Sequence, residues 1–221
     1  MRVQGFTTGV FQSNTYLIAE PEGDQAVIVD PGQDAAAHLL AAIEELGVSV
    51  QAVLLTHGHV DHVWNAAEVA RALDVPTFLH DADRYMLEDP GAAVGASTAG
   101  WDIEIPDTLE SLRDEQKFTY GSLAIETRHT PGHTPGHCVF LTDGLLVSGD
   151  LIFAGSVGRI DFPGGSMDAL MASIREVVLP LADDVTIISG HGPATTVGTE
   201  RTTNPFIRAD EDGSLPRLLG L

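Results

Sequence analysis

At four places in this 221-residue chain, an apolar segment or a turn ends in a motif that contains histidine or aspartate. The apolar run "QAVLL" (51–55) continues directly into "THGHVDH" (56–62), which holds three of the nine histidines and an aspartate. The others end in "HTPGHTPGH" (129–137), "SGD" (148–150) and "SGHG" (189–192). A strand that crosses the core and ends in such residues presents them at a rigid edge, and metal sites require that rigidity. The pattern therefore favours a strand-rich fold that holds metal ligands at a sheet edge.

Strand and helix patterns alternate along the chain, and residues 90–116 interrupt the alternation. That segment has many small residues and no clear periodicity, so it is predicted to be a long surface loop that can lie over the active site. Helices are predicted at 34–47, 63–74, 81–89 and 166–178. Strands are predicted at 14–20, 25–30, 50–55, 76–80, 117–121, 123–130, 137–143, 144–150 and 184–192. Each half has strands, then a strand ending in ligand-type residues, then a helix, which predicts an α/β fold of the αββα four-layer sandwich type.

Length and charge limit the class of protein. The length predicts a single domain over residues 1–221. The net charge of −21 repels phosphate backbones, so we expect no nucleic-acid partner. We also expect no signal peptide and no membrane span, because no apolar run has the required length. The single cysteine, Cys138, cannot form an internal disulfide, which favours a cytoplasmic setting.

The "THGHVDH" cluster is the strongest sign of chemistry. The alternative is a solvated turn with incidental histidines, but a turn needs no such density, and burying several unpaired imidazoles together is costly. His57 and His59 point to the same side of an extended backbone and can reach one ion. The mixture of imidazole and carboxylate suits divalent Zn, Fe or Mn.

Taken together, the four motifs resemble the metallo-β-lactamase superfamily. "THGHVDH" is similar to its H-x-H-x-D-H signature, and "PGHTPGH", "SGD" and "SGHG" follow in the order and approximate spacing of that family. Within the superfamily, "GSVGRIDFPGG" (155–165) and "ERTTNPFI" (200–207) resemble the short glyoxalase II-like hydrolases. The resemblance covers nearly the whole chain.

This resemblance implies a site with two divalent metal ions, zinc first and iron or manganese as alternatives. The implied ligands are His57, His59 and His133 for the first ion, Asp61, His62 and His191 for the second, and Asp150 for both. Asp30 is expected to support the histidine loop without touching metal. His137 is expected to support the ligands or to face the substrate, with a structural role as the alternative.

The implied activity is hydrolysis of a small-molecule thioester, an S-(2-hydroxyacyl)-thiol such as S-lactoylglutathione, by a hydroxide held between the metal ions. Asp61 is expected to be catalytic by orienting that hydroxide or accepting its proton. Arg159 is expected to bind a carboxylate of the thiol carrier; the alternative is that it pairs with Asp161. The identity of the carrier stays open, because the chain has only thirty residues after His191 and one lysine.

Competing activities are a mononuclear-iron persulfide dioxygenase, a lactonase and a β-lactamase. A metal-binding module without catalysis is a further alternative.

Overall fold

Two neighbouring strands explain how the chain forms layers. In β3 (Gln25–Val29), Ala26 and Ile28 pack toward one side while Val27 and Val29 pack toward the other. The strand β4 (Ser49–Leu54) alternates in the same way and pairs with β3 in parallel. Strands buried on both faces read as continuous apolar runs, which is why the sequence shows no polar face here. The computed structural model describes residues 1–95, 101 and 103–218.

The first sheet has six strands in the order β1-β2-β3-β4-β5-β6. The two N-terminal pairs are antiparallel and the pairs from β3 onward are parallel. The remaining strands of this sheet are β1 (Arg2–Thr8), β2 (Ser13–Ala19), β5 (Thr77–His80) and β6 (Leu109–Leu112).

The second sheet also has six strands, in the order β14-β13-β10-β9-β8-β7, and its one parallel pair is β10 with β13. A separate hairpin, β11 with β12, follows β10. These strands are β7 (Lys117–Tyr120), β8 (Leu123–His129), β9 (Cys138–Thr142), β10 (Leu145–Gly149), β11 (Ile152–Phe153), β12 (Ser156–Val157), β13 (Thr186–Ser189) and β14 (Thr195–Thr196).

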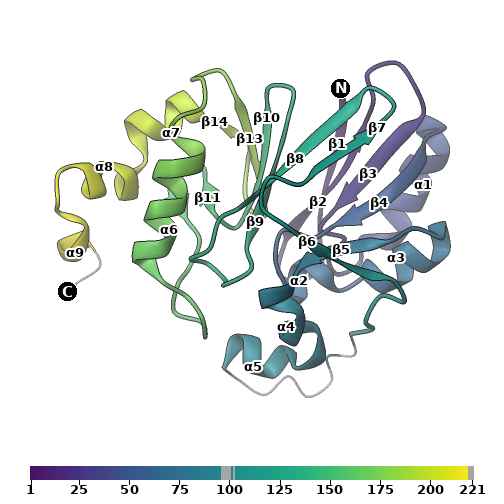
Figure 1. Ribbon diagram of the computed structural model, residues 1–221, viewed down its shortest axis with the longest axis horizontal. Coiled ribbons are helices and arrows are strands. Elements are labelled where there is room, and N and C mark those ends of the chain that lie inside the picture. The colour runs from purple at the N-terminus through teal and green to yellow at the C-terminus, as the bar shows by residue number, and fades with distance from the viewer. Residues whose placement is uncertain (96–100, 102, 219–221) are drawn as a thin grey trace.

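Helices cover the outer face of each sheet, and Figure 1 shows α1 and α3 on one side of the sheets and α6 on the other. Three apolar clusters fill the spaces between helices and first sheet, between the two sheets, and between second sheet and helices. This arrangement is the predicted αββα sandwich. The helices are α1 (Ala36–Leu46), α2 (Val60–Val63), α3 (Ala66–Leu73), η1 (Asp81–Asp83), α4 (Arg84–Glu88), α5 (Pro90–Val94), α6 (Met167–Ser173), the π-helical η2 (Ile174–Val178), α7 (Val197–Thr203), α8 (Pro205–Glu211) and α9 (Leu215–Leu218).

The expectation of one loop over residues 90–116 is wrong at both ends. Residues 90–94 form α5, where Pro90 starts the helix and the Asp89 side chain accepts from the amide of Ala92. Residues 109–112 form β6, because this segment pairs in parallel with β5 at the edge of the first sheet. Residues 96–100 and 102 of this segment lie outside the described part of the chain.

Other elements were also missed or misplaced. β1 was not predicted, because its alternately exposed residues give no apolar signal; its full pairing with β2 creates it. The predicted helix 63–74 is two helices, since Asn65 lies between them and binds the backbone of Pro31 and Ala35. The helices α7, α8 and α9 follow the last motif and were not predicted.

The parallel pairs place the motifs at one edge of the sandwich. Residues that follow β3 and β4 leave the first sheet at the same edge, because parallel strands end together. Residues that follow β10 and β13 do the same in the second sheet. The amide of Cys138 donates to the carbonyl of Thr56, and the amide of Asn14 donates to the carbonyl of Gly190, which joins the two sheets at this edge.

Candidate metal centre

Three imidazoles converge directly after β4 and between β8 and β9. We call His57, His59 and His133 the histidine cluster; all three are buried and their ligand atoms lie within 4.8 Å of one another. His133 Nε2 lies 2.8 Å from His59 Nδ1 and 3.2 Å from His57 Nε2. The other ring nitrogen of His133 donates to the carbonyl of Arg159 at 2.8 Å, which fixes its tautomer.

A chain of hydrogen bonds fixes the tautomer of His57. The Thr56 hydroxyl donates to Asp30 Oδ2 at 2.6 Å, so its oxygen accepts from His57 Nδ1, 3.0 Å away. In the neutral imidazole, His57 Nε2 then carries a lone pair, and that lone pair faces the lone pair of His133 Nε2. A cation between these nitrogens satisfies both, so the histidine cluster fits a metal ion.

A second group lies beside the first. We call Asp61, His62 and His191 the mixed cluster; their ligand atoms also lie within 4.8 Å of one another. Asp61 and His62 belong to α2, and His191 follows β13 with its Nε2 3.1 Å from Asp61 Oδ2. His62 Nδ1 donates to Asp30 Oδ2 at 2.9 Å, so its Nε2 points toward the cluster.

Asp150, at the end of β10, lies between the two clusters. Its Oδ2 is 3.6 Å from Nε2 of both His133 and His191, and its Oδ1 is 3.4 Å from His62 Nε2. Within the described residues, Asp150 Oδ1 and His62 Nε2 are buried and have no hydrogen-bond partner, and they lie 3.4 Å apart. Buried polar atoms are normally paired, so these two adjacent unpaired atoms fit a bound cation.

Asp30 and His137 form hydrogen bonds that hold the candidate ligands or the backbone next to them in place. Asp30 Oδ1 accepts from the Thr56 amide and Oδ2 accepts from Thr56 and His62. Asp30, His57 and His62 also lie close enough to suggest a cation site, but the oxygens of Asp30 are already occupied by hydrogen bonds. His137 Nε2 accepts from the amide of Asp150 at 3.1 Å and thereby holds the backbone of the central carboxylate.

The glycines of two motifs allow this packing. A Cβ at Gly149 would lie 2.6 Å from the Thr56 hydroxyl and 2.9 Å from His137 Nε2. A Cβ at Gly190 would overlap Asp150 Oδ1 and the ring of His62. The glycines of "SGD" and "SGHG" therefore let the second sheet approach the residues that follow the first.

One supporting residue was missed by the sequence reasoning. Asp83, in η1, is completely buried. Its Oδ2 accepts from the Gly58 amide at 3.2 Å and from the Thr134 hydroxyl at 2.6 Å, and its Oδ1 accepts from the Gly136 amide at 2.6 Å. It thus joins the loop of His57 and His59 to the loop of His133, although no sequence signal distinguishes it from its neighbour Asp81.

The two clusters have opposite electrostatics. Burial, with repulsion from neighbouring imidazoles, holds the pKa of His57 well below its ordinary value and lowers the pKa of His59 to about 3. Burial would also lower the pKa of His62, but the carboxylates of Asp61 and Asp150 raise it to about 10. Burial would raise the pKa of Asp61, yet His62 and the hydrogen bond from His191 hold it well below its usual range. His57 and His59 are therefore neutral, whereas His62 and Asp61 in the mixed cluster form a pair of opposite charges.

A pocket of about 520 Å³ opens onto both clusters. Residues of the predicted 90–116 segment contribute to it, namely Val94 and Trp101, and so does Arg159. Both oxygens of Asp161 accept hydrogen bonds from the Arg159 guanidinium, at 2.7 and 2.6 Å. The lining residues are Phe11, His59, Val60, Asp61, Val94, Trp101, His133, Asp150, Phe153, Val157, Arg159, Phe162 and His191.

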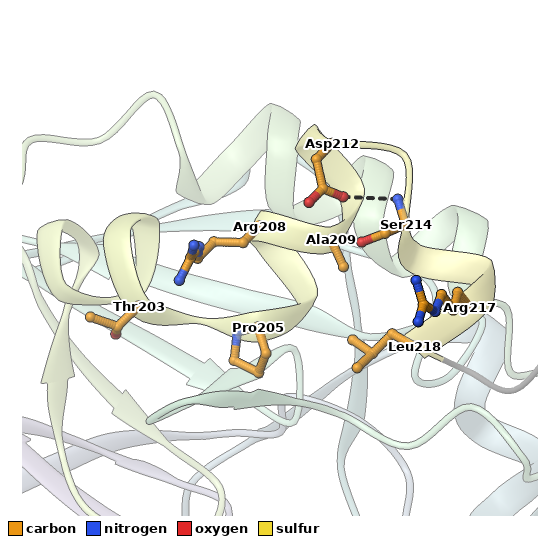
Figure 2. Close-up of a pocket in the computed structure, with 8 residues that line it drawn as sticks. All are labelled: Thr203, Pro205, Arg208, Ala209, Asp212, Ser214, Arg217 and Leu218. Atoms are coloured by element: carbon orange, nitrogen blue, oxygen red, sulfur yellow. Dashed lines mark hydrogen bonds between the residues drawn. The ribbon is translucent and has the colours of Figure 1, made fainter.

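A second hollow of about 540 Å³ lies among the C-terminal helices and contains none of these residues (Figure 2). Figure 2 shows Arg208 and Arg217 apart from each other with Ala209 between them, and Asp212 accepts from the Ser214 amide at 2.9 Å. It brings together no group of histidines or carboxylates, so the chemistry of the described residues is concentrated at the sheet edge.

The structure brings the sequence-predicted residues into one place. The seven predicted ligands form the two clusters and the carboxylate between them, Asp30 and His137 contact them from behind, and Arg159 lies at the pocket wall. His137 does not line the pocket. The described part of the chain contains no helix long and apolar enough to cross a membrane.

An αββα sandwich with paired histidine and carboxylate clusters at its edge defines a class of metal-dependent hydrolases. The family model "Metallo-beta-lactamase superfamily" matches residues 8–191, and the chain belongs to this superfamily. It is 38% identical over 213 residues to "Hydroxyacylglutathione hydrolase GloC" of Haemophilus influenzae, covering 95% of this chain and 99% of that protein.

Two solved structures are similar over almost the whole chain. The BLEG-1 B3 metallo-beta-lactamase superposes with a TM-score of 0.84 at 35% identity, over 93% of this chain and 99% of that one. TTHA1623, described in a di-iron-bound form, superposes with a TM-score of 0.79 at 39% identity, over 92% and 99%.

Proposed function

We propose that this metal-dependent hydrolase binds two divalent metal ions. The histidine cluster would hold the first ion and the mixed cluster the second, with Asp150 contributing to both. The unpaired buried atoms of His62 and Asp150, and the facing Nε2 atoms of His57 and His133, support this assignment. Zinc is the metal expected first, and iron or manganese suits the same donors.

The residues of the chain have separate tasks in this proposal. When bound, the ions lower the pKa of a coordinated water and polarise a carbonyl oxygen. Asp61 is ionised and lines the pocket, so it orients the attacking water by accepting a hydrogen bond. Asp30 holds the protonated nitrogen of His62 directly and that of His57 through Thr56, so that the Nε2 atoms of both rings face the other candidate ligands. The apolar walls limit competing water around the reacting carbonyl.

We further propose that the reaction is thioester hydrolysis of the glyoxalase II type, acting on S-(2-hydroxyacyl)-thiols such as S-lactoylglutathione. The observation that carries this proposal is the 38% identity to a hydroxyacylglutathione hydrolase over nearly the full length of both chains. The segment "GSVGRIDFPGG" supports it, because Val157, Arg159 and Phe162 line the pocket. The segment "ERTTNPFI" contacts this pocket wall from outside, since Glu200 accepts from the amide of Gly155.

The test combines metal analysis with a thiol-release assay. Protein purified without chelator should contain about two first-row metal ions per chain and should release thiol from S-lactoylglutathione. Asp61→Asn serves as the catalytically impaired control. A stable content of one iron, with oxygen consumption on a persulfide, would instead identify a persulfide dioxygenase.

A β-lactam or lactone ring is the second candidate substrate. The 35% identity to the BLEG-1 β-lactamase favours it, because the same clusters can act on any activated carbonyl. Hydrolysis of such a ring with no thiol release from any thioester would replace the first proposal by the second.

A further inference from the structure

Apart from the candidate metal ligands and Arg159, the described residues that line the pocket are apolar. Two phenyl rings flank the clusters: the Phe162 ring lies 5.5 Å from the His59 ring, and the Phe153 ring lies 6.1 Å from the His191 ring. Farther out, Phe11 meets Trp101 edge to face at 5.9 Å. Together with Val60, Val94 and Val157, these rings give the substrate an apolar surface on several sides of the reacting centre.

Arg159 is the one lysine or arginine among the described lining residues, and its charge is already compensated. Its guanidinium donates two hydrogen bonds to the carboxylate of Asp161 and lies 3.7 Å from the centre of the Phe162 ring. The sequence of 96–102 contributes no lysine or arginine either. A carboxylate on a substrate would therefore have to compete with Asp161 for the guanidinium.

Away from the candidate metal centre, the pocket offers no free positive charge to an anionic substrate. Asp61 and Asp150 would be neutralised by the ions they hold, and the chain as a whole carries a charge of −21. An anion brought to the apolar walls loses water without gaining a partner, whereas an apolar group gains free energy by leaving water.

We propose that this pocket takes an uncharged, apolar arm of the substrate, an aromatic or branched alkyl group, and that the favoured thiol carrier has no carboxylate. This inference rests on the proposed thioesterase activity and narrows its substrate class. It also gives Asp161 a role, as the residue that withholds the cation of Arg159 from carboxylated carriers.

Kinetics on matched substrates test the inference with metal-loaded protein. The lactoyl group is kept constant on 2-phenylethanethiol, N-acetylcysteamine and glutathione. We expect kcat/KM to fall in this order, by about tenfold or more from first to last, since a phenyl ring leaving water gains at least that much. A higher kcat/KM on the glutathione thioester than on the other two would overturn the inference, while absence of thiol release from all of them would overturn the proposed function instead.

Two variants separate the apolar walls from the ion pair. Phe153→Ala should lower kcat/KM about tenfold on the phenylethyl thioester and leave the glutathione thioester nearly unchanged. Asp161→Asn should free the guanidinium and raise kcat/KM on the glutathione thioester about tenfold, mainly through KM. Asp168→Asn, an equally exposed carboxylate in the first turn of α6, is the matched charge control and should change neither. Equal effects of each variant on both substrates would contradict the assignment.

Binding gives a readout that does not depend on turnover. Trp101 lines this pocket, and the ring of the second tryptophan of the chain, Trp64, lies 6.3 Å from the Trp101 ring. In Trp64→Phe, fluorescence reports Trp101 alone, and titration with 2-phenylethyl methyl sulfide should saturate at about tenfold lower concentration than titration with S-methylglutathione. Tighter binding of S-methylglutathione would refute the apolar assignment even if no thioester is hydrolysed.

Discussion

The histidine cluster and the mixed cluster lie side by side at one sheet edge, yet they solve different physical problems. The histidine cluster is buried, and within it His57 and His59 are neutral imidazoles. In the mixed cluster the side chains of His191 and Asp61 remain 31% and 17% exposed, and it contains a carboxylate beside two imidazoles. The charge of a buried side chain here depends on its neighbours: His57 among imidazoles is neutral, whereas the equally buried His62 is charged beside Asp61 and Asp150.

The difference teaches how burial selects ligand types. A neutral imidazole enters an apolar interior at the cost of its hydrogen bonds alone, and the backbone and Thr56 supply these for the histidine cluster. An ionised carboxylate needs an opposite charge or solvent, and Asp61 has both His62 and the open pocket. We call the ion of the histidine cluster the deeper ion and the ion of the mixed cluster the outer ion. We therefore expect the deeper ion to be bound mainly through the fixed geometry of its ligands, and the outer ion mainly through electrostatic attraction.

Two residues link the clusters, and the largest expected effect comes from the central one. Asp150→Ala removes the carboxylate that lies against His62, His133 and His191, so metal should be lost from both clusters. Activity should fall by about a thousandfold or more, because the contribution of a metal ion is several kcal/mol. Elemental analysis of the purified variant measures the loss, with exposed Asp143→Ala as the control. Full metal content in Asp150→Ala would show that this carboxylate does not serve both clusters.

Asp61→Asn should show whether the two clusters bind metal independently of each other. It removes the negative charge from the mixed cluster only, so the variant should keep about one ion per chain while activity falls about a hundredfold. Metal titration followed by competition with a chelator distinguishes the retained ion from the lost one. Loss of both ions to the same extent would mean that the clusters bind metal as one unit.

Asp30→Asn should weaken both clusters by a smaller amount. The amide can donate to His62 Nδ1 and so place the proton on Nε2, and it disturbs the bonds to Thr56 that orient His57. We expect a 10- to 100-fold loss of affinity at each cluster, roughly the usual effect of a residue behind the ligands. Chelator competition at both ions measures it; an effect confined to one ion would show that Asp30 supports only that cluster.

Asp83→Asn should affect the histidine cluster alone and has the smallest expected effect. The amide places a donor against donors from the loops of His57 and His133, so the affinity of the deeper ion should fall by about tenfold. Asp81→Asn is the matched control, because Asp81 lies two residues away, is exposed and pairs with Arg84. An equal loss at the outer ion would indicate general destabilisation, which thermal unfolding of the two variants would reveal.

Much of this architecture was accessible from local patterns. The apolar runs that became β3, β4, β10 and β13 predicted the buried strands, and the polar residues at their ends predicted where the clusters lie. β1 and β6 were not accessible, because an edge strand with alternating exposed residues is defined by its partner. The contacts that orient the site were equally hidden, since they join segments distant in sequence.

The sequence by itself determined which residue types bear the lone pairs and that they follow buried strands, because both depend on local composition and periodicity. Tertiary structure decided which of two carboxylates in "DAD" supports the centre: Asp81 is exposed, whereas Asp83 is buried. It also decided that Arg159 faces Asp161 and that the pocket walls are aromatic. The physical reason is that a carboxylate is oriented by donors from other segments, here 25 and 53 residues away from Asp83, and only folding brings those donors together.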